Sequence, residues 1–476
     1  MNKFIGIVCF LFASLSADLP AQHRVFGPDQ GNCIGRNLVE GPQAGHYVFF
    51  GAERPVQQPN QDLFCLYVLD AQLQTLTIKH IEVPGNAAPG AVARLSNGDY
   101  ALAGLWYNAQ GSSRAWMARL NPQLDTLWTK TITAPSGNAS FKRVMEAPNG
   151  SIAWLGTHTR PGGNDNDLWL YATDGSGAKL WEFFGGDTQN DVGQGLAWHP
   201  QGFWLLSGDV LLGSYGNMVV ALDSLGQFKW QRLITDQNVN GNQTLLAHSQ
   251  GDIFLIGEST TNQGFAFDLF VVRLNENGQV KRYGYVGESG TDAGFQAEWL
   301  GNDTLLVTGY TASYPNAGPV SPYLLTMNMD FEEAAIHWLP RNQVSIGQGL
   351  YWNPVDRKAV VSGSEGDRHF VWRSGLDSLM PGIFQSGLVL SVPQHMEEAH
   401  FWYPNPANQS LNPPTGALPK QIRIFTASGR LLWESSKPPA ENASLSLPMD
   451  WPNGHYILEW VDAQGVVHRQ KLRIQR

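Results

Sequence analysis

The sequence of 476 residues has few cysteines, no long run of Lys or Arg, and only one long apolar segment. It carries 31 Lys and Arg residues against 41 Asp and Glu residues, for a net charge of −10 at pH 7. Proteins that bind nucleic acid present a basic stripe, so this class of partner is excluded. The G-x-S-x-G, P-loop and C-x-x-C motifs are also missing. No segment keeps the 3.6-residue period of an amphipathic helix, which excludes a helical solenoid.

The one apolar segment lies at the N-terminus. Lys3 supplies a positive charge, Phe4–Leu15 is an apolar run of 12 residues, and Ser16 and Ala17 are small residues that offer a cleavage site. This pattern predicts a secretory signal peptide over residues 1–17. Twelve apolar residues are too few to span a bilayer, and no later stretch could cross one, so we expect no transmembrane segment in the mature chain.

Removal of the signal peptide leaves Cys33 and Cys65 as the only cysteines. In an exported protein such a pair can form a disulfide. A bridge requires Cα atoms within about 7 Å, and Cys65 is expected in a third strand while Cys33 precedes the innermost one. The sequence therefore leaves two alternatives open, a Cys33–Cys65 disulfide or two unpaired buried thiols.

Seven glycines recur along the chain at intervals of 49 to 54 residues, and we call them the anchor glycines. They are Gly51, Gly104, Gly156, Gly208, Gly257, Gly309 and Gly363. A period near 50 with strand-like content is typical of small β units that stack on one another. In five units another glycine lies six residues earlier, and Asn97-Gly98 is a strong hairpin signal because the turn needs a positive φ. We expect each anchor glycine in the second strand of its unit.

The sequence pattern of each repeat unit predicts four antiparallel strands. The hairpin that contains the anchor glycine is followed by a third strand, such as Leu63–Leu69, which ends at Asp or Asn. A fourth, outer strand carries a Trp in three units. Seven such units predict an all-β fold, a seven-bladed β-propeller over residues 22–385. The segment Val25-Phe26-Gly27 echoes the end of later units, so we expect it to pair with the last unit and close the ring.

Two segments carry a resemblance to a known family. Asn166–Gly193 and Phe267–Gly294 resemble the β-propeller repeats that are common in secreted proteins of Bacteroidetes-type bacteria. The resemblance extends from Gly27 to Gly382 and is specific for fold. Because most members of that family have no known function, it implies the architecture and no activity.

The glycine period stops near Phe384, and the sequence changes character after it. We expect a linker over residues 386–400 and a small β-sandwich over residues 401–476. The last segment resembles the C-terminal sorting domain of the type IX secretion system. The residues that carry the resemblance are Tyr403, Pro404, Asn405, Pro406, Gly429, Arg430, Gly454 and Tyr456, together with the basic end KLRIQR. The Pro-rich insertion Asn412–Lys420 departs from the family, which has a strand there.

The resemblance to a sorting domain implies a route and a partner. Outer-membrane type IX secretion machinery would recognise this domain after the chain reaches the periplasm. The domain would then be removed, and the protein released or anchored at the cell surface. We therefore expect a secreted or cell-surface protein.

Two groups of polar residues could hold a metal ion. The first is in the linker and consists of His395, Glu397, Glu398 and His400. A zinc-protease helix needs histidines four residues apart, whereas these are five apart, so we expect solvated side chains. The second precedes strands and consists of Asp187, Asp191, Asp292 and the segment Asn164–Asp167. Such oxygens suit Ca²⁺, but they also cap turns, which is the interpretation we favour. No other cofactor is expected.

Three features of the repeats allow functional interpretations: outer-strand tryptophans, the number of units, and aromatic residues after the anchor glycines. The segments around Trp181 and Trp230 resemble the tryptophan-docking motif of quinone-dependent dehydrogenase propellers, but a Trp on an outer strand also packs against the next unit. Sialidase propellers resemble the chain in blade count, but their aspartate boxes are missing. Four aromatic residues just after anchor glycines could stack on sugars or pack within loops. They are Trp106, Tyr107, Tyr215 and Tyr310.

Two classes of function remain. The class we favour is a non-catalytic propeller for adhesion or for binding a glycan or protein ligand, and no catalytic residue is assigned. The alternative is a secreted hydrolase or oxidoreductase whose site is built from dispersed loop residues. Aromatic and amide side chains at the mouth of the central channel would favour binding. Convergent Asp, Glu, Arg or His side chains there would favour catalysis.

Overall fold

The structure is a computed structural model that describes most of the chain between residues 22 and 474. The described residues are 22–29, 32–134, 137–159, 165–186, 190–211, 215–234, 240–260, 267–287, 290–314, 318–331, 334–376, 410–411, 420–426, 430–435, 445–448, 451–452, 454–461 and 467–474. The predicted signal peptide, linker and His395–His400 group lie outside them. Among the described residues, no helix is long and apolar enough to cross a membrane.

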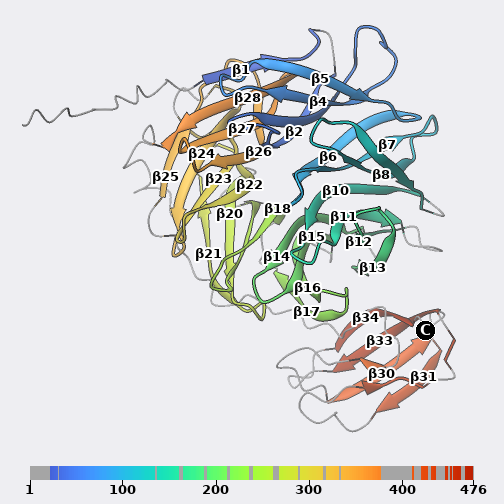
Figure 1. Ribbon diagram of the computed structural model, residues 1–476. Coiled ribbons are helices and arrows are strands. Elements are labelled where there is room, and N and C mark those ends of the chain that lie inside the picture. The colour runs from blue at the N-terminus through green and yellow to red at the C-terminus, as the bar shows by residue number, and fades with distance from the viewer. Residues whose placement is uncertain are drawn as a thin grey trace, which may run out of the picture.

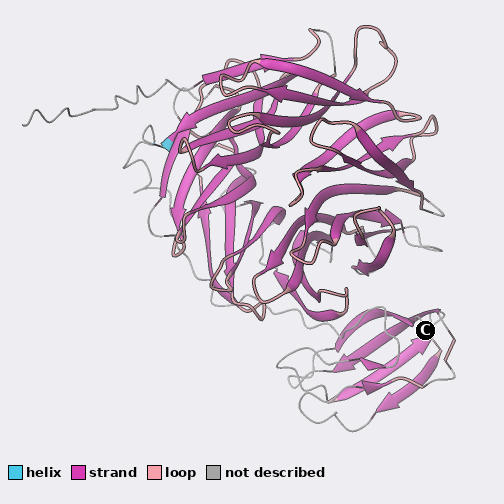
Figure 2. Ribbon diagram, in the orientation of Figure 1, coloured by secondary structure: helices cyan, strands magenta, loops and turns pink. Residues whose placement is uncertain are grey.

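Strands β1 to β28 form seven four-stranded antiparallel sheets that follow one another around a ring (Figure 1). Strands and connecting loops make up almost all of it (Figure 2). Sheets 1 and 2 contain β2 (Ile34–Glu40), β3 (Tyr47–Glu53), β4 (Leu63–Leu69) and β5 (Thr75–Ile81), then β6 (Asn86–Arg94), β7 (Tyr100–Tyr107), β8 (Ser113–Leu120) and β9 (Thr126–Ile132). Sheets 3 and 4 contain β10 (Ala139–Glu146), β11 (Ile152–Thr159), β12 (Asn166–Thr173) and β13 (Lys179–Gly185), then β14 (Val192–His199), β15 (Phe203–Leu211), β16 (Tyr215–Asp223) and β17 (Phe228–Ile234).

The last three sheets of the ring repeat the same order. Sheets 5 and 6 contain β18 (Asn240–Ala247), β19 (Ile253–Thr260), β20 (Phe267–Leu274) and β21 (Val280–Val286), then β22 (Asp292–Leu300), β23 (Thr304–Thr311), β24 (Ser321–Asn328) and β25 (Ala334–Trp338). Sheet 7 contains β26 (Ser345–Asn353), β27 (Lys358–Glu365), β28 (Arg368–Gly375) and β1 (Gln22–Phe26).

The start of the chain completes sheet 7. Strand β1 pairs antiparallel with β28, so that Phe26 lies opposite His369. The predicted pairing of the N-terminal segment with the last unit is therefore confirmed. It covers the free edge of β28 and ties the beginning of the ring to its end.

Apolar side chains hold neighbouring sheets together. Among the described residues, one buried cluster lies between each sheet and the next, including one between sheet 7 and sheet 1. Successive residues of a strand point to opposite faces, so Val48 and Phe50 face sheet 2 while Tyr47 and Phe49 face sheet 7. Each second strand is thus buried on both faces, which explains its nearly continuous apolar sequence.

A β-bulge interrupts every innermost strand at the same height, opposite the anchor glycine. The anchor glycines pair with Gly35, Pro89, Phe141, Gly193, Asn242, Gly294 and Gly347, and the register shifts directly after each of these residues. The residues that follow them at the bulges are Arg36, Gly90, Lys142, Gln194, Gln243, Phe295 and Gln348.

Close contact with the bulged strand explains why glycine is needed. At six anchor glycines, a Cβ atom would stand 1.7–2.9 Å from a backbone carbonyl oxygen of the innermost strand, for example that of Ala293 at Gly309. None of these six glycines has a positive φ, so the requirement is one of space and not of backbone conformation. The period of about 50 residues therefore marks where a second strand and a bulge meet.

The C-terminal segment forms its own sheets. Strands β30 (Gln421–Thr426), β31 (Leu431–Ser435), β33 (Gly454–Val461) and β34 (Val467–Ile474) form one sheet, and β29 (Ser410–Leu411) pairs with β32 (Leu445–Ser446). A separate apolar cluster that includes Ile424, Leu458 and Trp460 lies against the larger sheet. Of the sorting-motif residues, Gly454 and Tyr456 lie in β33 and Arg430 just before β31. Tyr403–Pro406 and Gly429 lie outside the described residues.

We predict that Gly309→Ala destabilises the ring. The new Cβ would lie 1.7 Å from the Ala293 carbonyl oxygen, so the strands must separate. Forcing atoms into a packed site costs about 1–3 kcal/mol of the free energy of unfolding. Gly375→Ala is the control, because no atom lies within 4 Å of the corresponding Cβ. Urea unfolding checks the prediction, and equal midpoints for the two variants would contradict it.

Candidate functional site

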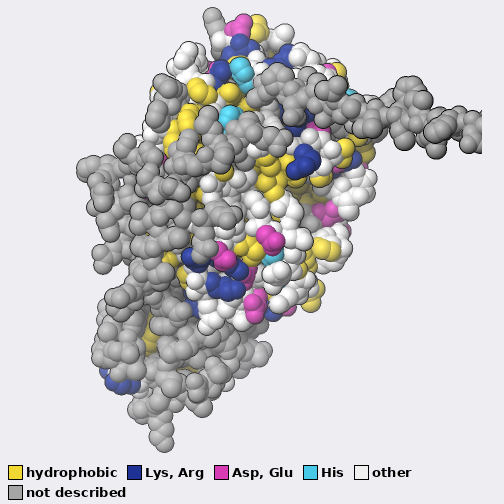
Figure 3. Space-filling view, turned by 90° about the vertical axis from the view of Figure 1, so that its left-hand side faces the viewer, with side chains coloured by type: hydrophobic (Ala, Val, Ile, Leu, Met, Phe, Trp, Pro, Cys, Tyr) yellow, Lys and Arg dark blue, Asp and Glu magenta, His cyan; other side chains and the backbone are white. Residues whose placement is uncertain are grey.

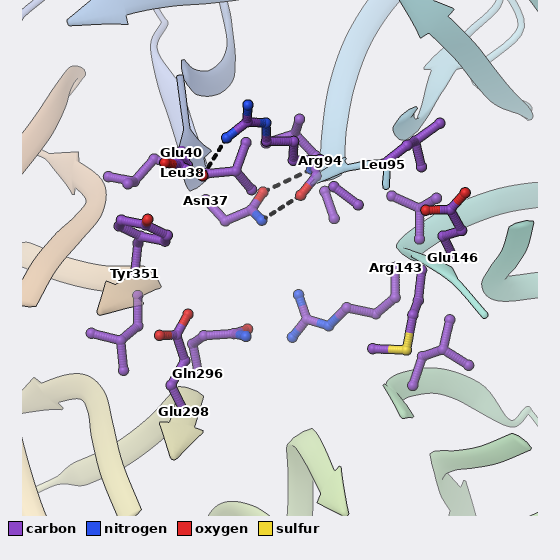
Figure 4. A pocket seen from close by; sticks show the side chains of 18 of the residues that line it. Asn37, Leu38, Glu40, Arg94, Leu95, Arg143, Glu146, Gln296, Glu298 and Tyr351 are labelled. Atoms are coloured by element: carbon purple, nitrogen blue, oxygen red, sulfur yellow. Dashed lines mark hydrogen bonds and ion pairs between the residues drawn. The ribbon is translucent and has the colours of Figure 1, made fainter. Parts of the chain in front are cut away.

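A cavity of about 770 Å³ lies among the innermost strands of the seven sheets. Its lining includes residues of β2, β6, β10, β14, β18, β22 and β26, so every sheet contributes to it. Figure 4 shows side chains that reach it from around the ring, among them Arg143, Gln296, Glu298 and Tyr351. We call this cavity the channel pocket. Its volume is in the range of small-molecule binding sites.

Side chains from the bulges connect the innermost strands across the ring. Lys142 donates to the side-chain oxygens of Gln194 and, at 3.5 Å, Gln243. Arg36 donates to the Gln348 side-chain oxygen at 2.6 Å and to the Pro89 carbonyl oxygen at 3.0 Å. The bulges therefore place two cations and several amides around the channel.

Arg143, the residue after the bulge at Lys142, extends into the channel pocket (Figure 4). Its Nε donates to the Gln194 carbonyl oxygen at 2.9 Å and its Nη2 to the Gln243 carbonyl oxygen at 2.6 Å. Within the described part of the chain, no carboxylate forms an ion pair with it. Burial, together with the Arg36 guanidinium, lowers the pKa of Arg143 to about 10, so the side chain remains charged at neutral pH.

The neighbouring Lys142 is near its point of deprotonation. Burial lowers the pKa of its ammonium group to about 7, and the charges of Arg143 and Arg36 act in the same direction. Asp209 and Glu258, which follow the anchor glycines of sheets 4 and 5, oppose that shift. Three cationic side chains therefore converge on the channel of a protein whose net charge is −10.

The carboxyl groups of the channel pocket have partners on neighbouring sheets. Glu40 pairs with Arg94, which links sheets 1 and 2. Glu146 accepts from the backbone N–H of Ser96 at 2.5 Å and links sheets 2 and 3. Glu298 accepts from the backbone N–H of Trp352 at 2.7 Å and links sheets 6 and 7.

Glu298 does not neutralise the nearby cations at neutral pH. Burial raises the pKa of its carboxyl to about 8, and the hydrogen bond from the Trp352 N–H only partly offsets this. The carboxyl is therefore mostly protonated near pH 7. Among the described lining residues, Arg94 and Arg143 then balance Glu40 and Glu146, and Arg143 is the cation that forms no ion pair with a carboxylate. Elsewhere charge is mixed, since Figure 3 shows small groups of both signs on the side that faces its viewer.

The channel mouth carries both kinds of side chain that were expected to separate binding from catalysis. Gln296 is one of its amides and Tyr351 its aromatic residue, whereas Arg143 and Glu298 are two of its ionisable residues. The sequence did not single out any of these four residues. The repeat itself could have indicated the bulges next to Arg143 and Gln296. Their bulge residues, Lys142 and Phe295, each lie fourteen residues before an anchor glycine.

Both cysteines lie in a second polar cluster, between sheet 1 and sheet 7. The structure has Cys33 and Cys65 as free, buried thiols. The Cys65 Sγ lies 3.4 Å from His369 Nε2, which in turn lies 2.9 Å from Glu53 Oε2. Burial raises the pKa of the Cys33 thiol to about 12 and holds the pKa of the Cys65 thiol well above its usual value, and the Glu53 charge adds to both shifts.

Glu53 remains ionised in this cluster. Burial alone would raise its pKa, but the hydrogen bonds from His369, His80 and Tyr67 outweigh burial and hold the pKa at about 2. The Tyr67 hydroxyl donates to Oε2 at 2.7 Å, and His80 Nε2 lies 2.6 Å from Oε1.

The loop carboxylates proposed for Ca²⁺ make local contacts at the starts of strands. The Asp191 N–H donates to the Asn166 carbonyl oxygen at 2.8 Å, and Asp292 accepts from the Ser313 hydroxyl. Asp187 and Asn164 lie outside the described residues. Across the described ranges, the one group of three or more His, Cys, Asp and Glu side chains close enough to share a metal ion is Cys33, Glu53 and His369. Calcium binding stays a prediction.

The outer-strand tryptophans contact the next sheet. A Cβ at Gly226 of sheet 4 would lie 2.4 Å from the Trp181 ring, and one at Gly278 of sheet 5 would lie 2.6 Å from the Trp230 ring. The Trp230 indole N–H also donates to the Glu276 carbonyl oxygen at 3.1 Å. The packing interpretation of these residues is therefore confirmed.

The four candidate sugar-stacking aromatics differ in environment. Tyr107 is exposed, whereas the Trp106 ring packs against the cluster between sheets 1 and 2. The Tyr310 ring lies 5.7 Å from that of Phe295, and burial raises the pKa of its hydroxyl to about 12. Tyr215 begins β16. Of the three whose side chains the structure describes, Trp106, Tyr107 and Tyr310, none lines the channel pocket.

The ring of sheets defines a β-propeller protein. Comparisons with protein-family models and with curated proteins give no match. Similar solved structures include an α-L-arabinanase from Penicillium chrysogenum (12% identity, 76% of this chain and 99% of that chain, TM-score 0.45). Drosophila Semaphorin 2a is 8% identical over 96% of this chain and 98% of its own, with a TM-score of 0.48.

A third similar structure is the β-propeller domain of the Trilobed protease from Pyrococcus furiosus. It is 13% identical and covers 72% of this chain and 95% of its own, with a TM-score of 0.40. All three structures have low identity and TM-scores below 0.5. The likeness concerns fold, and no inference about ligand or activity is drawn from it.

We predict that Glu298→Gln weakens the pH dependence of stability. The unfolded carboxyl ionises near pH 4.5, whereas the folded one retains its proton to about pH 8. The folded state binds the extra proton in this window, so the contribution of Glu298 to the free energy of unfolding falls as pH rises from about 4.5 to 8. Glutamine has no proton to lose. Urea unfolding across this window measures the slope, with Glu146→Gln as the control at another pocket carboxyl. Equal slopes for the wild type and Glu298→Gln would contradict the prediction.

Proposed function

We propose that the chain is an exported, non-catalytic, seven-bladed β-propeller that binds a carboxylate-bearing glycan in the channel pocket. The observation that carries this proposal is the position of Arg143. Its guanidinium group lies in a cavity of about 770 Å³, and its described hydrogen bonds go to two backbone carbonyl oxygens. A planar guanidinium group matches the geometry of a carboxylate, which could approach it from the open cavity.

The rest of the pocket supports an acidic sugar. Gln296 offers an amide for hydroxyl groups, and Tyr351 offers an aromatic ring beside Leu350. Glu298 is protonated near neutral pH, so it can donate a hydrogen bond and does not repel an anion. This combination of a cation, an amide and an aromatic ring provides the polar and stacking contacts that an acidic oligosaccharide needs.

The carboxyl groups support a binding function over hydrolysis. Glycoside hydrolysis uses a pair of carboxyl groups that reach the scissile bond. In the channel pocket Glu40 is held by Arg94, Glu146 by Ser96 and Glu298 by the Trp352 N–H. Each of these contacts joins neighbouring sheets, so these carboxyl groups serve to hold adjacent sheets together.

We expect that Arg143→Gln weakens binding of acidic glycans by about 10- to 100-fold, because a hydrogen bond to a charged group contributes about 1.5–3 kcal/mol. A glycan array with the mature full-length protein identifies the ligand, and calorimetry measures the affinity. Arg114→Gln is the matched control, since Arg114 lies in β8 and does not line the pocket. Carboxyl-reduced versions of the bound glycans should lose affinity for the wild type.

Two results would contradict the binding proposal. One is a set of array ligands that are all neutral, which would leave Arg143 without a role in recognition. The other is an equal affinity of the wild type and Arg143→Gln for an acidic glycan. Turnover of a bound glycan, followed by chromatography of the products, would favour the alternative of a hydrolase.

Export by the type IX route is the second part of the proposal. It rests on the residues of the C-terminal segment and on their separate pairing, since β29 to β34 pair with one another and not with β1 to β28. We predict that deletion of residues 401–476 leaves a folded propeller in the periplasm. Cell fractionation in a bacterium that has type IX machinery measures this, and fusion of residues 401–476 to an unrelated periplasmic protein is the complementary test. Normal surface or medium levels of the truncated chain would contradict the prediction.

A further inference from the structure

Four buried side chains from distant parts of the sequence meet where the ring closes. Cys33 lies between β1 and β2, Cys65 in β4, Glu53 at the end of β3, and His369 in β28. They span sheet 1 and sheet 7, and the Cys65 and His369 side chains have no exposed surface. Ligand atoms of Cys33, Glu53 and His369 all lie within 4.8 Å of one another. Cys65 is not part of this group of three, but its Sγ is 3.4 Å from His369 Nε2.

The geometry points to a structural zinc site with Cys33, Cys65, His369 and Glu53 as its four ligands. Zinc takes Cys sulfur at about 2.3 Å, His nitrogen at about 2.0 Å and carboxylate oxygen at about 2.1 Å in a tetrahedron. Two such ligands, one sulfur and one nitrogen, then lie about 3.5 Å apart. The Cys65–His369 separation of 3.4 Å matches this edge.

The Glu53 carboxylate needs only a small adjustment to bind the same ion. His369 Nε2 and Glu53 Oε2 are 2.9 Å apart, a hydrogen-bond distance, whereas nitrogen and oxygen ligands of one zinc ion lie about 3.3 Å apart. A metal ion would take the place of the proton on His369 Nε2, which would move to Nδ1 as the neutral ring changes tautomer, and the two ligand atoms would separate by a few tenths of an ångström. The two thiol protons would leave to solvent, and no oxidation step is involved.

The surroundings of the cluster fit a cation. Glu53 is 2% exposed, and its described side-chain partners are His369, His80 and Tyr67, with no Lys or Arg among them. A divalent ion would coordinate this carboxylate directly, and the two thiolates would cancel the charge of the ion, so the cluster would keep the single negative charge that Glu53 gives it. His80 and Tyr67 would keep orienting the carboxylate, as groups outside the coordination sphere commonly do.

A glycine keeps the space beside the cluster open. Gly27 has φ +97°, and a Cβ there would stand 3.0 Å from Cys33 Sγ and 3.5 Å from Glu53 Oε2. The bound ion would connect the N-terminal segment to β3, β4 and β28. It would therefore reinforce the closure that β1 and β28 make through hydrogen bonds.

Zinc content and thiol protection in the mature full-length protein test the inference. We expect about one zinc ion per chain after dialysis against Zn²⁺, and both thiols protected from a thiol reagent until a chelator is added. Co²⁺ in place of Zn²⁺ should give thiolate-to-metal charge-transfer absorption. Cys33→Ala, Cys65→Ala and His369→Gln should each reduce zinc content at least about tenfold. His199→Gln, at another histidine with no exposed surface, is the matched control and should bind as the wild type does.

Two outcomes would overturn the zinc site, and both are read on the wild type, so a variant that fails to fold does not obscure them. The first is a chain that binds no zinc and whose two thiols react equally with and without Zn²⁺. The second is a chain with no reactive thiols even after denaturation and chelation, which would show a Cys33–Cys65 disulfide instead.

Discussion

The contact between six of the seven anchor glycines and the carbonyl groups of a bulged innermost strand is the constraint on which the rest of the structure depends. It brings the second strand closer to the first than any side chain would allow, and it fixes the height of the bulge in every sheet. The bulge adds one residue to the innermost strand, so it breaks the alternation of side chains between the two faces of the sheet and changes the direction of the side chains beside it. A steric requirement at one backbone position thereby determines which residues surround the channel.

That constraint explains how several cationic side chains gather at the channel of a protein with a net charge of −10. Lys142 and Arg36 lie at bulges and Arg143 lies directly after one, so three cations meet around the channel although they are far apart in the sequence. Amide oxygens and backbone carbonyl groups accept their hydrogen bonds, while the Asp209 and Glu258 carboxylates partly offset the charge of Lys142. The desolvation that lowers the pKa of Lys142 to about 7 is the cost of this arrangement. A bound anion would relieve that cost, which is why the proposed ligand carries a carboxylate.

The sequence predicted the repeating elements well and the sites poorly. Leu63–Leu69 was predicted with the bounds that β4 has, and the N-terminal strand was predicted to pair with the last unit. Both follow from local alternation and from repetition, which a single sequence shows. The role of Arg143 depends on a bulge, a shift of one residue that leaves no local signal. The Cys65–His369 contact joins residues 304 positions apart, and only ring closure brings them together.

The location of a bound anion tests the central claim most directly. In a crystal structure of the mature protein grown in bromide, anomalous scattering marks each anion without a choice of glycan. We expect a bromide ion in the channel pocket within hydrogen-bond distance of the Arg143 guanidinium, and its loss in Arg143→Gln. Bromide ions found only on the outer surface, with an empty channel pocket, would contradict it.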